Sequence, residues 1–388
     1  MTLPDGLQAA VAARYARYVG DLASLVGVDC GSYTPAGVNR VADAVSGTLK
    51  ELGATVERIP HVPTDGERQL GDLVIGRLEG SGPRLLLIGH MDTVFEPGTA
   101  ALRPFKVEGD RATGPGVSDM KGGLLAGLHG LAALRRVERR PSVTFVANPD
   151  EEIGSPFSTA HIRKLIADHE AALVLECARA NGDIVSARKG IADYEVTITG
   201  RAAHAGVEPE KGRSAILEAA HQVLALHALN GRWPSATVNA GVIEGGTRPN
   251  VIAASCRMEV DLRAASASEF EMAAAEMEGI VTRPTVEGVS ATLRKAAFHP
   301  PMERTPGNAR LAELAISIAG ELGFELRDAL TGGASDANTT TAAGLPTLDG
   351  LGPVGGDDHS ADEWLDLTSV VPRTTLLAAL IDRVAEAI

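Results

Sequence analysis

The first part of the chain alternates between helical and strand-like patterns of hydrophobic residues. Over Leu7–Val26 and Gly37–Leu52 the apolar positions recur with helical spacing. Short apolar runs follow, "DLVIGRL" and "RLLLIGH", of the kind found in strands buried on both faces. The stretch "GGLLAGLHGLAALRRV" then places Leu124, Leu128 and Leu131 on one helical face, before the runs "SVTFVANP" and "AALVLE". This order predicts an α/β domain with a mostly parallel sheet and helical crossovers.

The pattern changes near residue 188, where "IADYEVTITGR" alternates with a period of two. The following segments are predicted to be a helix ("RSAILEAAHQVLALHAL"), two strands ("ATVNAGVIEGG", "ASCRMEVDLRA"), a helix ("SASEFEMAAAEMEGIVTR") and a strand ("GVSATLRKAAF"). This is the β-α-β-β-α-β order of a ferredoxin-like domain. After residue 299 the α/β pattern resumes and ends in the helical stretch "RTTLLAALIDRVAEAI". We therefore predict a domain over 188–299 inserted into a larger one built from 1–187 and 300–388.

Composition and charge narrow the classes of partner. A chain of 388 residues, 44% of them hydrophobic, can bury a large core. The formal net charge of -14 argues against binding to nucleic acid or to an anionic membrane and is compatible with cation binding. The N-terminal segment lacks the pattern of an export signal, no stretch approaches roughly 20 apolar residues, and the three cysteines have no CxxC spacing. We expect a cytoplasmic protein that binds small molecules or metals.

Histidines and acids stand where the apolar runs end. In an open α/β sheet the ligand crevice lies outside the carboxyl ends of the strands, so these side chains are expected to converge there with two loop residues. Three of the acids are consecutive, in "NPDEEIGS", and buried neighbouring carboxylates repel one another unless a positive charge is present. The strand-end residues are His90, Asp92, Glu151, Glu152 and Glu176, and the loop residues are Asp119 and His359.

This set of histidines and carboxylates suits zinc, and no cysteine competes for it. Two Zn²⁺ ions carry four positive charges, which Asp119, Glu152, Glu176 and one bridging hydroxide would balance. One glutamate of the pair 151–152 would ligate while the other stays free as a base. Two ions about 3.5–4 Å apart would then polarise a carbonyl and activate water. The sequence therefore predicts metal-assisted hydrolysis.

Other features of the sequence agree with this chemistry. Asp92 is placed to hold His90 through the second nitrogen of the imidazole ring. The motifs HExxH and GxSxG are absent. The stretch "GPGVSD" lacks both the third glycine of the dinucleotide fingerprint and the GK[ST] of a P-loop. Serine hydrolysis and nucleotide binding are therefore disfavoured.

The stretches "GHMDTV", "GPGVSDMKGG", "PDEEIGS", "GRAAHAG", "GGASDAN" and "HSADEW" occur in this order along nearly the whole chain. The ordered set resembles the dizinc aminoacylase/carboxypeptidase metallopeptidase superfamily, and most of all its carboxypeptidase G (glutamate carboxypeptidase) branch. The resemblance implies two zinc ions per subunit, for which Co²⁺ or Mn²⁺ can substitute. It assigns His90 and Glu176 to one ion, Glu152 and His359 to the other, and Asp119 to both.

The same resemblance implies roles in catalysis and substrate binding. Glu151 would be the general base that activates metal-bound water, and Asp92 the orienting carboxylate. The inserted domain would be a dimerisation and lid domain that lends His204 to the partner subunit's site as an oxyanion donor. Asn250 and Arg263 would hold the substrate carbonyl and the free α-carboxylate. The substrate would be a small peptide or an N-acyl amino acid, and the protein a homodimer.

Several alternatives stay open. An N-acyl-amino-acid deacylase of the acetylornithine or succinyl-diaminopimelate type would use the same metal centre, and a non-catalytic metal-binding scaffold would not need a free base. His204 could be a surface histidine, and Arg263 could pair with Glu259 or Asp261. In the glutamate-specific enzymes a lysine helps to hold the side-chain carboxylate of the substrate, whereas here isoleucine stands near the expected place in "NGDIVSARKG". Arg188 and Lys189 could substitute for it, so a preference for C-terminal glutamate stays open.

Overall fold

The computed structural model describes residues 6–134 and 141–388, so that the end of the predicted helical stretch, 135–137, lies outside the described residues. The chain divides into two compact units. Unit 1 consists of Met1–Ser186, Arg304–Leu330 and Ser335–Ile388, and unit 2 consists of Ala187–Glu303 and Thr331–Ala334. Each unit has its own hydrophobic core.

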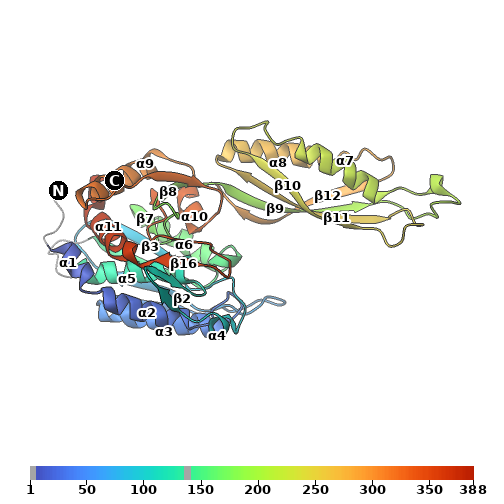
Figure 1. Ribbon diagram of the computed structural model, residues 1–388. Helices are drawn as coiled ribbons and strands as arrows, with labels where there is room; N and C mark the ends of the chain where they lie inside the picture. Colours follow the sequence, from blue (N-terminus) through green and yellow to red (C-terminus); the bar gives the residue numbers. More distant parts are fainter. Residues whose placement is uncertain (1–5, 135–140) are drawn as a thin grey trace. The chain divides into compact units, whose positions relative to one another are not determined.

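Unit 1 is built on a six-stranded sheet with the order β1-β2-β6-β3-β7-β14 (Figure 1). Strands β6, β3, β7 and β14 are parallel neighbours, and β2 is antiparallel to both β1 and β6. Five strands therefore run in one direction, which confirms the predicted mostly parallel sheet. The strands are β1 (Thr55–Ile59), β2 (Leu73–Leu78), β3 (Arg84–His90), β6 (Ser142–Asn148), β7 (Ala171–Val174) and β14 (Thr347–Leu348).

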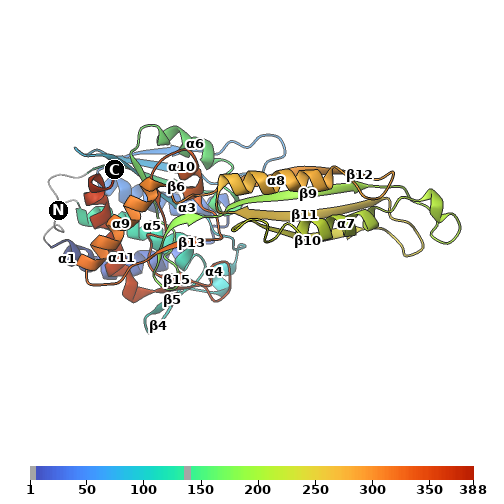
Figure 2. The ribbon, with the colours of Figure 1, turned by 90° about the horizontal axis from the view of Figure 1, so that it is seen from above.

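Helices pack around this sheet and bury its central strands almost completely (Figure 2). The first predicted helix is in fact two helices, α1 and α2. The helices of unit 1 are α1 (Leu7–Ala12), α2 (Tyr15–Val26), α3 (Pro35–Glu51), α4 (Thr99–Leu102), α5 (Gly123–Leu134), α6 (Ser158–Ile166), α9 (Pro306–Glu321), α10 (Asp336–Ala342) and α11 (Val370–Arg383).

Short strands complete the larger unit. Strands β15, β16, β5 and β4 form a small antiparallel sheet, and β13 pairs with β8. Their bounds are β4 (Lys106–Glu108), β5 (Arg111–Thr113), β8 (Ile184–Arg188), β13 (Asp328–Thr331), β15 (Gly355–Gly356) and β16 (Trp364–Asp366).

Two glycines let separate segments meet at the end of β7. A Cβ atom on Gly123, the first residue of α5, would lie 1.7 Å from the carbonyl oxygen of Leu175. A Cβ atom on Gly352 would lie 2.9 Å from the carbonyl oxygen of Glu176. Since real Cβ atoms do not approach a backbone oxygen so closely, only glycine allows α5 and the 352 loop to pack against this strand end. The loop that precedes α5 is thereby held beside Glu176.

Unit 2 contains the predicted β-α-β-β-α-β order in one antiparallel sheet, β10-β11-β9-β12. On β9 the buried residues alternate with exposed ones, as expected for a sheet that is covered on one face only. Helices α7 and α8 lie on the covered face (Figure 1). The elements are β9 (Gly190–Thr199), α7 (Ala215–His227), β10 (Thr237–Gly245), β11 (Ser255–Ala264), α8 (Ala267–Val281) and β12 (Ser290–His299).

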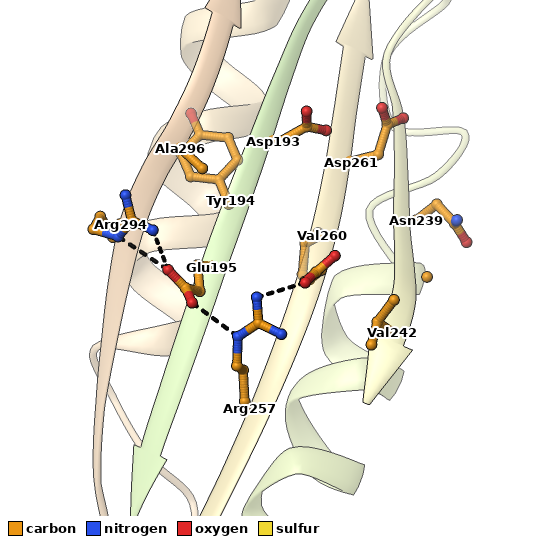
Figure 3. Close-up of a pocket in the computed structure, with 12 residues that line it drawn as sticks. Asp193, Tyr194, Glu195, Asn239, Val242, Arg257, Val260, Asp261, Arg294 and Ala296 are labelled. Carbon is orange, nitrogen blue, oxygen red and sulfur yellow. Dashed lines mark hydrogen bonds and ion pairs between the residues drawn. The ribbon is translucent and has the colours of Figure 1, made fainter. Parts of the chain in front are cut away.

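The other face of this sheet carries charged side chains around a cavity of about 380 Å³ (Figure 3). Glu195 accepts hydrogen bonds from Arg257 at 2.8 Å and from Arg294 Nε at 3.0 Å. Arg257 also donates to Glu259. These charges offset one another on an open surface. The strand ends of unit 1 are therefore a better candidate for a ligand site than this cavity.

Candidate metal centre

The carboxyl ends of three neighbouring parallel strands lie together in unit 1. Strand β3 ends at His90, which pairs with Asn148 at the end of β6. A short 3₁₀ turn, Glu151–Ile153, follows β6. On the other side of β3, Glu176 lies two residues after the end of β7. Parallel pairing thus brings one histidine and two successive glutamates to the same edge of the sheet as Glu176.

Asp119 lies at the middle of this group. It belongs to the irregular turn Val117–Gly122 that leads into α5, where its own backbone is not helical. Its Oδ1 atom lies 3.1 Å from His90 Nε2, and its Oδ2 atom lies 3.1 Å from His359 Nε2. His359 has a left-handed backbone, with φ 63°, in the loop between β15 and β16. The two carboxylate oxygens of Asp119 therefore face two different histidines.

Two further distances place Glu152 and Glu176 in the same cluster. His359 Nε2 lies 3.1 Å from Glu152 Oε2, and His90 Nε2 lies 3.7 Å from Glu176 Oε1. Ligand atoms of His90, Asp119 and Glu152 lie within 4.8 Å of one another, and so do those of His90, Glu151 and Glu176. All five residues predicted as metal ligands thus lie in one cluster, and Glu151 lies beside them.

The carboxylates of the cluster favour positive charge beside them. Burial opposes a charge on His90, but the carboxylates of Glu176, Asp119 and Asp92 raise its pKa well above the ordinary value. Hydrogen bonds to Asp119 and Glu152 raise the pKa of His359 to about 10. Burial also raises the pKa values of Glu151 and Glu152. Protons therefore supply the positive charge that the carboxylates need, and a divalent metal would displace them.

Asp92 contacts His90, and it also supports the turn after β6, which the sequence did not reveal. His90 Nδ1 lies 3.0 Å from the backbone oxygen of Asp92 and 3.4 Å from its carboxylate. The same carboxylate accepts hydrogen bonds from the backbone N–H groups of Glu151 and Glu152, both at 3.2 Å, and from Ser32 Oγ at 2.6 Å. Asp92 thus contacts the histidine and also holds the turn that carries both glutamates.

The third consecutive acid, Asp150, binds groups at the start of α6. Its carboxylate accepts a hydrogen bond from the Phe157 N–H at 2.6 Å and contacts the hydroxyl of Ser158 at the start of α6. Burial raises the pKa of Asp150 to about 7, against the effect of these hydrogen bonds. The run of three acids therefore combines one structural carboxylate with two that reach the cluster.

Glu363 is a further residue that sequence reasoning missed. Its buried carboxylate accepts hydrogen bonds from the backbone N–H groups of Gly116, Ser118 and Asp119 at 2.8, 2.8 and 3.0 Å. It therefore fixes the turn that carries Asp119. Its place in "HSADEW", four residues after His359, was the available signal, but nothing in the sequence pairs it with residues 116–119.

His204 and Asn250 lie together in unit 2. His204 forms an isolated antiparallel β-bridge with Val251, and the Ala205 N–H donates to the Asn250 carbonyl at 3.0 Å. Both side chains are exposed, and His204 Nδ1 accepts a hydrogen bond from the Gly206 N–H at 3.1 Å.

Three basic side chains of unit 2 have partners of their own. Arg263 Nε donates to Asp261 Oδ1 at 3.0 Å and Arg263 Nη1 to the Gly332 carbonyl, so the ion pair considered from the sequence is present. Arg188 donates to the Gly333 carbonyl, and Lys189 to the Ser235 carbonyl.

The donor set fits divalent metal ions. Two imidazoles and two carboxylates surround Asp119, whose two oxygens each lie 3.1 Å from a different histidine. Nitrogen and oxygen donors without thiolate suit zinc and related first-row ions.

Among residues 6–134 and 141–388, no helix combines the length and apolarity needed to cross a bilayer.

The chain resembles known hydrolases in sequence. Residues 86–383 match the model of peptidase family M20/M25/M40. The chain is 32% identical over 369 residues to carboxypeptidase G2 from a Pseudomonas species, with 93% of this chain and 87% of the relative covered. It is 29% identical over 369 residues to acetylornithine deacetylase from Edwardsiella ictaluri, with 88% of this chain and 90% of the relative covered.

A similar fold is found in solved structures. The aminopeptidase PepT from Bacillus cereus superposes with a TM-score of 0.80 at 24% identity, with 96% of this chain and 99% of that chain covered. A metallo-carboxypeptidase of family M20 from Sulfolobus solfataricus superposes with a TM-score of 0.73 at 16% identity, with 94% and 98% covered. Since the family match extends over well over half of the sequence, the chain belongs to peptidase family M20/M25/M40 and is a hydrolase that acts on amide bonds.

Proposed function

We propose that this protein hydrolyses the amide bond next to a free carboxylate in small peptides or N-acyl amino acids, with two divalent metal ions, Zn²⁺ in the first instance. The observation that carries the proposal is the position of Asp119 between His90 and His359, with one carboxylate oxygen toward each. His90 and Glu176 would hold one ion, Glu152 and His359 the other, and Asp119 both. The metals would supply Lewis acidity, which lowers the pKa of water and polarises the substrate carbonyl.

The chain's own residues would then move the proton. Glu151 takes a proton from the attacking water and returns it to the leaving amine. Its burial raises the pKa of its carboxyl group, which makes it a stronger base than an exposed glutamate. Asp92 positions this residue through the backbone N–H of Glu151. The partner subunit's His204 stabilises the negative charge on the substrate oxygen, together with Asn250.

The substrate class is supported by the relatives. One is named a carboxypeptidase and another an acetylornithine deacetylase, and both names describe hydrolysis of an amide in a molecule with a free carboxylate. Arg263 would bind that carboxylate, which requires it to exchange or share its partner Asp261. A deacylase of N-acyl amino acids is the second candidate, because a similar share of the chain matches such enzymes.

The decisive experiment compares two neighbouring glutamates. Glu151→Gln removes the proposed base but no proposed ligand, so turnover should be abolished while metal content stays near that of the wild type. Glu152→Gln removes a ligand and should lose metal. Substrates would be C-terminal Glu, Asp and neutral dipeptides and N-acyl amino acids, tested with Zn²⁺, Co²⁺ and Mn²⁺. Equal metal loss in both variants, measured by elemental analysis, would refute the assignment.

We further infer that unit 2 pairs with a second copy of the chain. Helix α7 exposes Leu217 and Leu224, which are 51% and 72% accessible, and the edge strand β10 exposes Ile243. An uncovered strand edge beside exposed leucines favours association. Leu224→Glu should convert a dimer into a monomer in light scattering, whereas Leu102→Glu, at an exposed leucine of unit 1, should not. A wild-type monomer at micromolar concentration would contradict this inference.

A further inference from the structure

His359 lies in the short loop between β15 and β16. The backbone of this loop is left-handed at Asp357, with φ 56°, and at His359, with φ 63°. This conformation disfavours residues other than glycine and has to be held by the surrounding structure. The side chain of His359 is 55% exposed, against 1% for His90. Contacts of the loop, more than burial, therefore place this histidine.

Trp364, the first residue of β16, contacts the start of this loop. Its indole N–H donates to the carboxylate of Asp357 at 3.0 Å. The backbone of Trp364 pairs with Gly356, and a Cβ atom on Gly356 would lie 3.2 Å from the indole ring. The ring therefore packs against the backbone directly before Asp357.

The indole ring is itself held by the small antiparallel sheet. Trp364 pairs with Thr113 on the neighbouring strand β5. The guanidinium carbon of Arg111, at the start of β5, lies 4.3 Å from the centre of the indole ring. This cation–π contact stabilises the ring in one orientation. The donor of the hydrogen bond to Asp357 is thus fixed on a strand.

Two further contacts hold later residues of the loop. Cys177 Sγ lies 3.6 Å from Asp358 Oδ2, and Arg103 donates to the Ser360 carbonyl at 2.8 Å. Neither contact reaches Asp357. Among the described residues, the side chain of Asp357 has Trp364 as its hydrogen-bond partner.

Two successive residues of the chain hold the two segments that meet at the metal centre. Glu363 fixes the turn that carries Asp119, and Trp364 contacts the loop that carries His359. The side chains of Asp119 and His359 lie 3.1 Å apart. The position of β16 therefore bears on both of these proposed ligands.

We propose that Trp364 is a positioning residue for His359 and thereby sets the affinity for one of the two metal ions. This inference rests on the proposed function, in which His359 and Glu152 hold that ion. Trp364 acts through Asp357 and does not touch the metal. The other ion, assigned to His90 and Glu176, would depend less on this contact, because those ligands lie at the ends of core strands.

Trp364→Phe provides the perturbation, because it keeps an aromatic ring beside Arg111 and removes the N–H donor. Trp233→Phe is the matched control, since Trp233 is the other tryptophan of the chain and lies in unit 2, between α7 and β10. Asp357→Asn is a second control. Its amide oxygen still accepts the hydrogen bond, and asparagine tolerates a left-handed backbone.

Zinc affinity is measured by titration calorimetry of the EDTA-treated proteins after dialysis. Partners that orient metal ligands contribute about 10- to 100-fold in affinity, and an exposed hydrogen bond belongs at the lower end. We expect Trp364→Phe to weaken one of the two binding steps about tenfold and to leave the other within threefold. Trp233→Phe and Asp357→Asn should keep both steps within threefold of the wild type.

Asp357→Ala is a second test variant, which removes the acceptor and leaves β16 intact. Alanine also strains the left-handed backbone, so its effect is compared in two backgrounds. In the Trp364→Phe background, Asp357→Ala should weaken zinc binding at least threefold less than in the wild type, because the hydrogen bond can be lost only once. The strain is common to both backgrounds and cancels.

Fluorescence gives a readout that a general loss of stability would not produce. The Trp233→Phe protein has Trp364 as its single tryptophan. Zinc bound to His359 would restrict the loop that accepts the indole N–H. The emission of Trp364 should therefore change with zinc, at the Kd of the step that Trp364→Phe weakens. The emission of Trp233, measured in the Trp364→Phe protein, should stay constant.

The outcomes separate this inference from the proposed function. Zinc binding in which Trp364→Phe changes neither step by threefold, or weakens both equally, would overturn the positioning role, and so would a Trp364 emission that is indifferent to zinc. If the expected effects are found but the wild type hydrolyses no substrate of the screen, the positioning role holds and the proposed reaction fails. If the wild type binds neither Zn²⁺, Co²⁺ nor Mn²⁺, the metal centre and this inference fail together.

Discussion

Replacing Glu363 by glutamine should weaken both the fold of unit 1 and its affinity for metal. One carboxylate oxygen of Glu363 accepts from the N–H groups of Ser118 and Asp119, and the other accepts from that of Gly116. A glutamine has only one acceptor oxygen. If that oxygen stays with Ser118 and Asp119, its NH₂ group faces the Gly116 N–H, and two donors oppose each other.

The expected magnitude follows from these three bonds. A buried N–H without an acceptor costs about 1–3 kcal/mol. The two bonds that remain lose the assistance of the negative charge, which roughly halves their strength and adds about 1–2 kcal/mol. The free energy of unfolding should therefore fall by roughly 2–5 kcal/mol. Burial raises the pKa of Glu363 to about 7, so the comparison belongs at pH 8.5, where the carboxylate is ionised.

Two assays check this expectation. Urea denaturation of the EDTA-treated proteins gives the change in stability, and zinc titration calorimetry gives the affinity. Because Glu363 fixes the turn that carries Asp119, zinc affinity should fall about 10- to 100-fold. Asp362→Asn is the control, since it removes an exposed neighbouring charge and should change stability by less than about 0.5 kcal/mol. A destabilised variant with unaltered zinc affinity would refute the link between Glu363 and the metal centre.

Three further predictions concern separate parts of the molecule. His204→Ala should lower kcat by about 10²–10³-fold with unchanged metal content; mixing it with Glu151→Gln should restore activity in hybrid dimers, and no recovery in hybrids verified by mass spectrometry would exclude a shared site. Burial, with the charge of Arg14, lowers the pKa of His129 to about 4 from 6.5, so this histidine's contribution to the free energy of unfolding should be complete above pH 6.5 and decline by up to about 3 kcal/mol as the pH falls toward 4. His129→Gln should flatten this part of the plot of unfolding free energy against pH, measured with urea, and an unchanged slope would count against the assignment. EDTA should lower the Tm of unit 1, and free Zn²⁺ at 100 times its Kd should restore about 2.7 kcal/mol; a Tm indifferent to both would argue against a metal centre in the folded state.

The sequence by itself determined the layout of both units. The β-α-β-β-α-β order of unit 2 could be predicted because the period of the hydrophobic pattern switches between two and 3.6 within segments of adequate length. The convergence of His90, Glu152 and Glu176 could be predicted because parallel strands end at one edge of a sheet. Both inferences depend on local patterns and on one general rule of topology.

Only the tertiary structure decided which polar groups meet. Glu363 lies 244 residues from Asp119 and yet accepts a hydrogen bond from its backbone N–H. Asp150 looks like its two neighbours in the sequence, but a turn directs it to the start of α6. A cavity of about 780 Å³ in unit 1 joins residues from three separate stretches, around 33, 59–70 and 153–161. Hydrogen bonds and packing act over a few ångströms in space, and no period or motif in the chain encodes which distant residues will come that close.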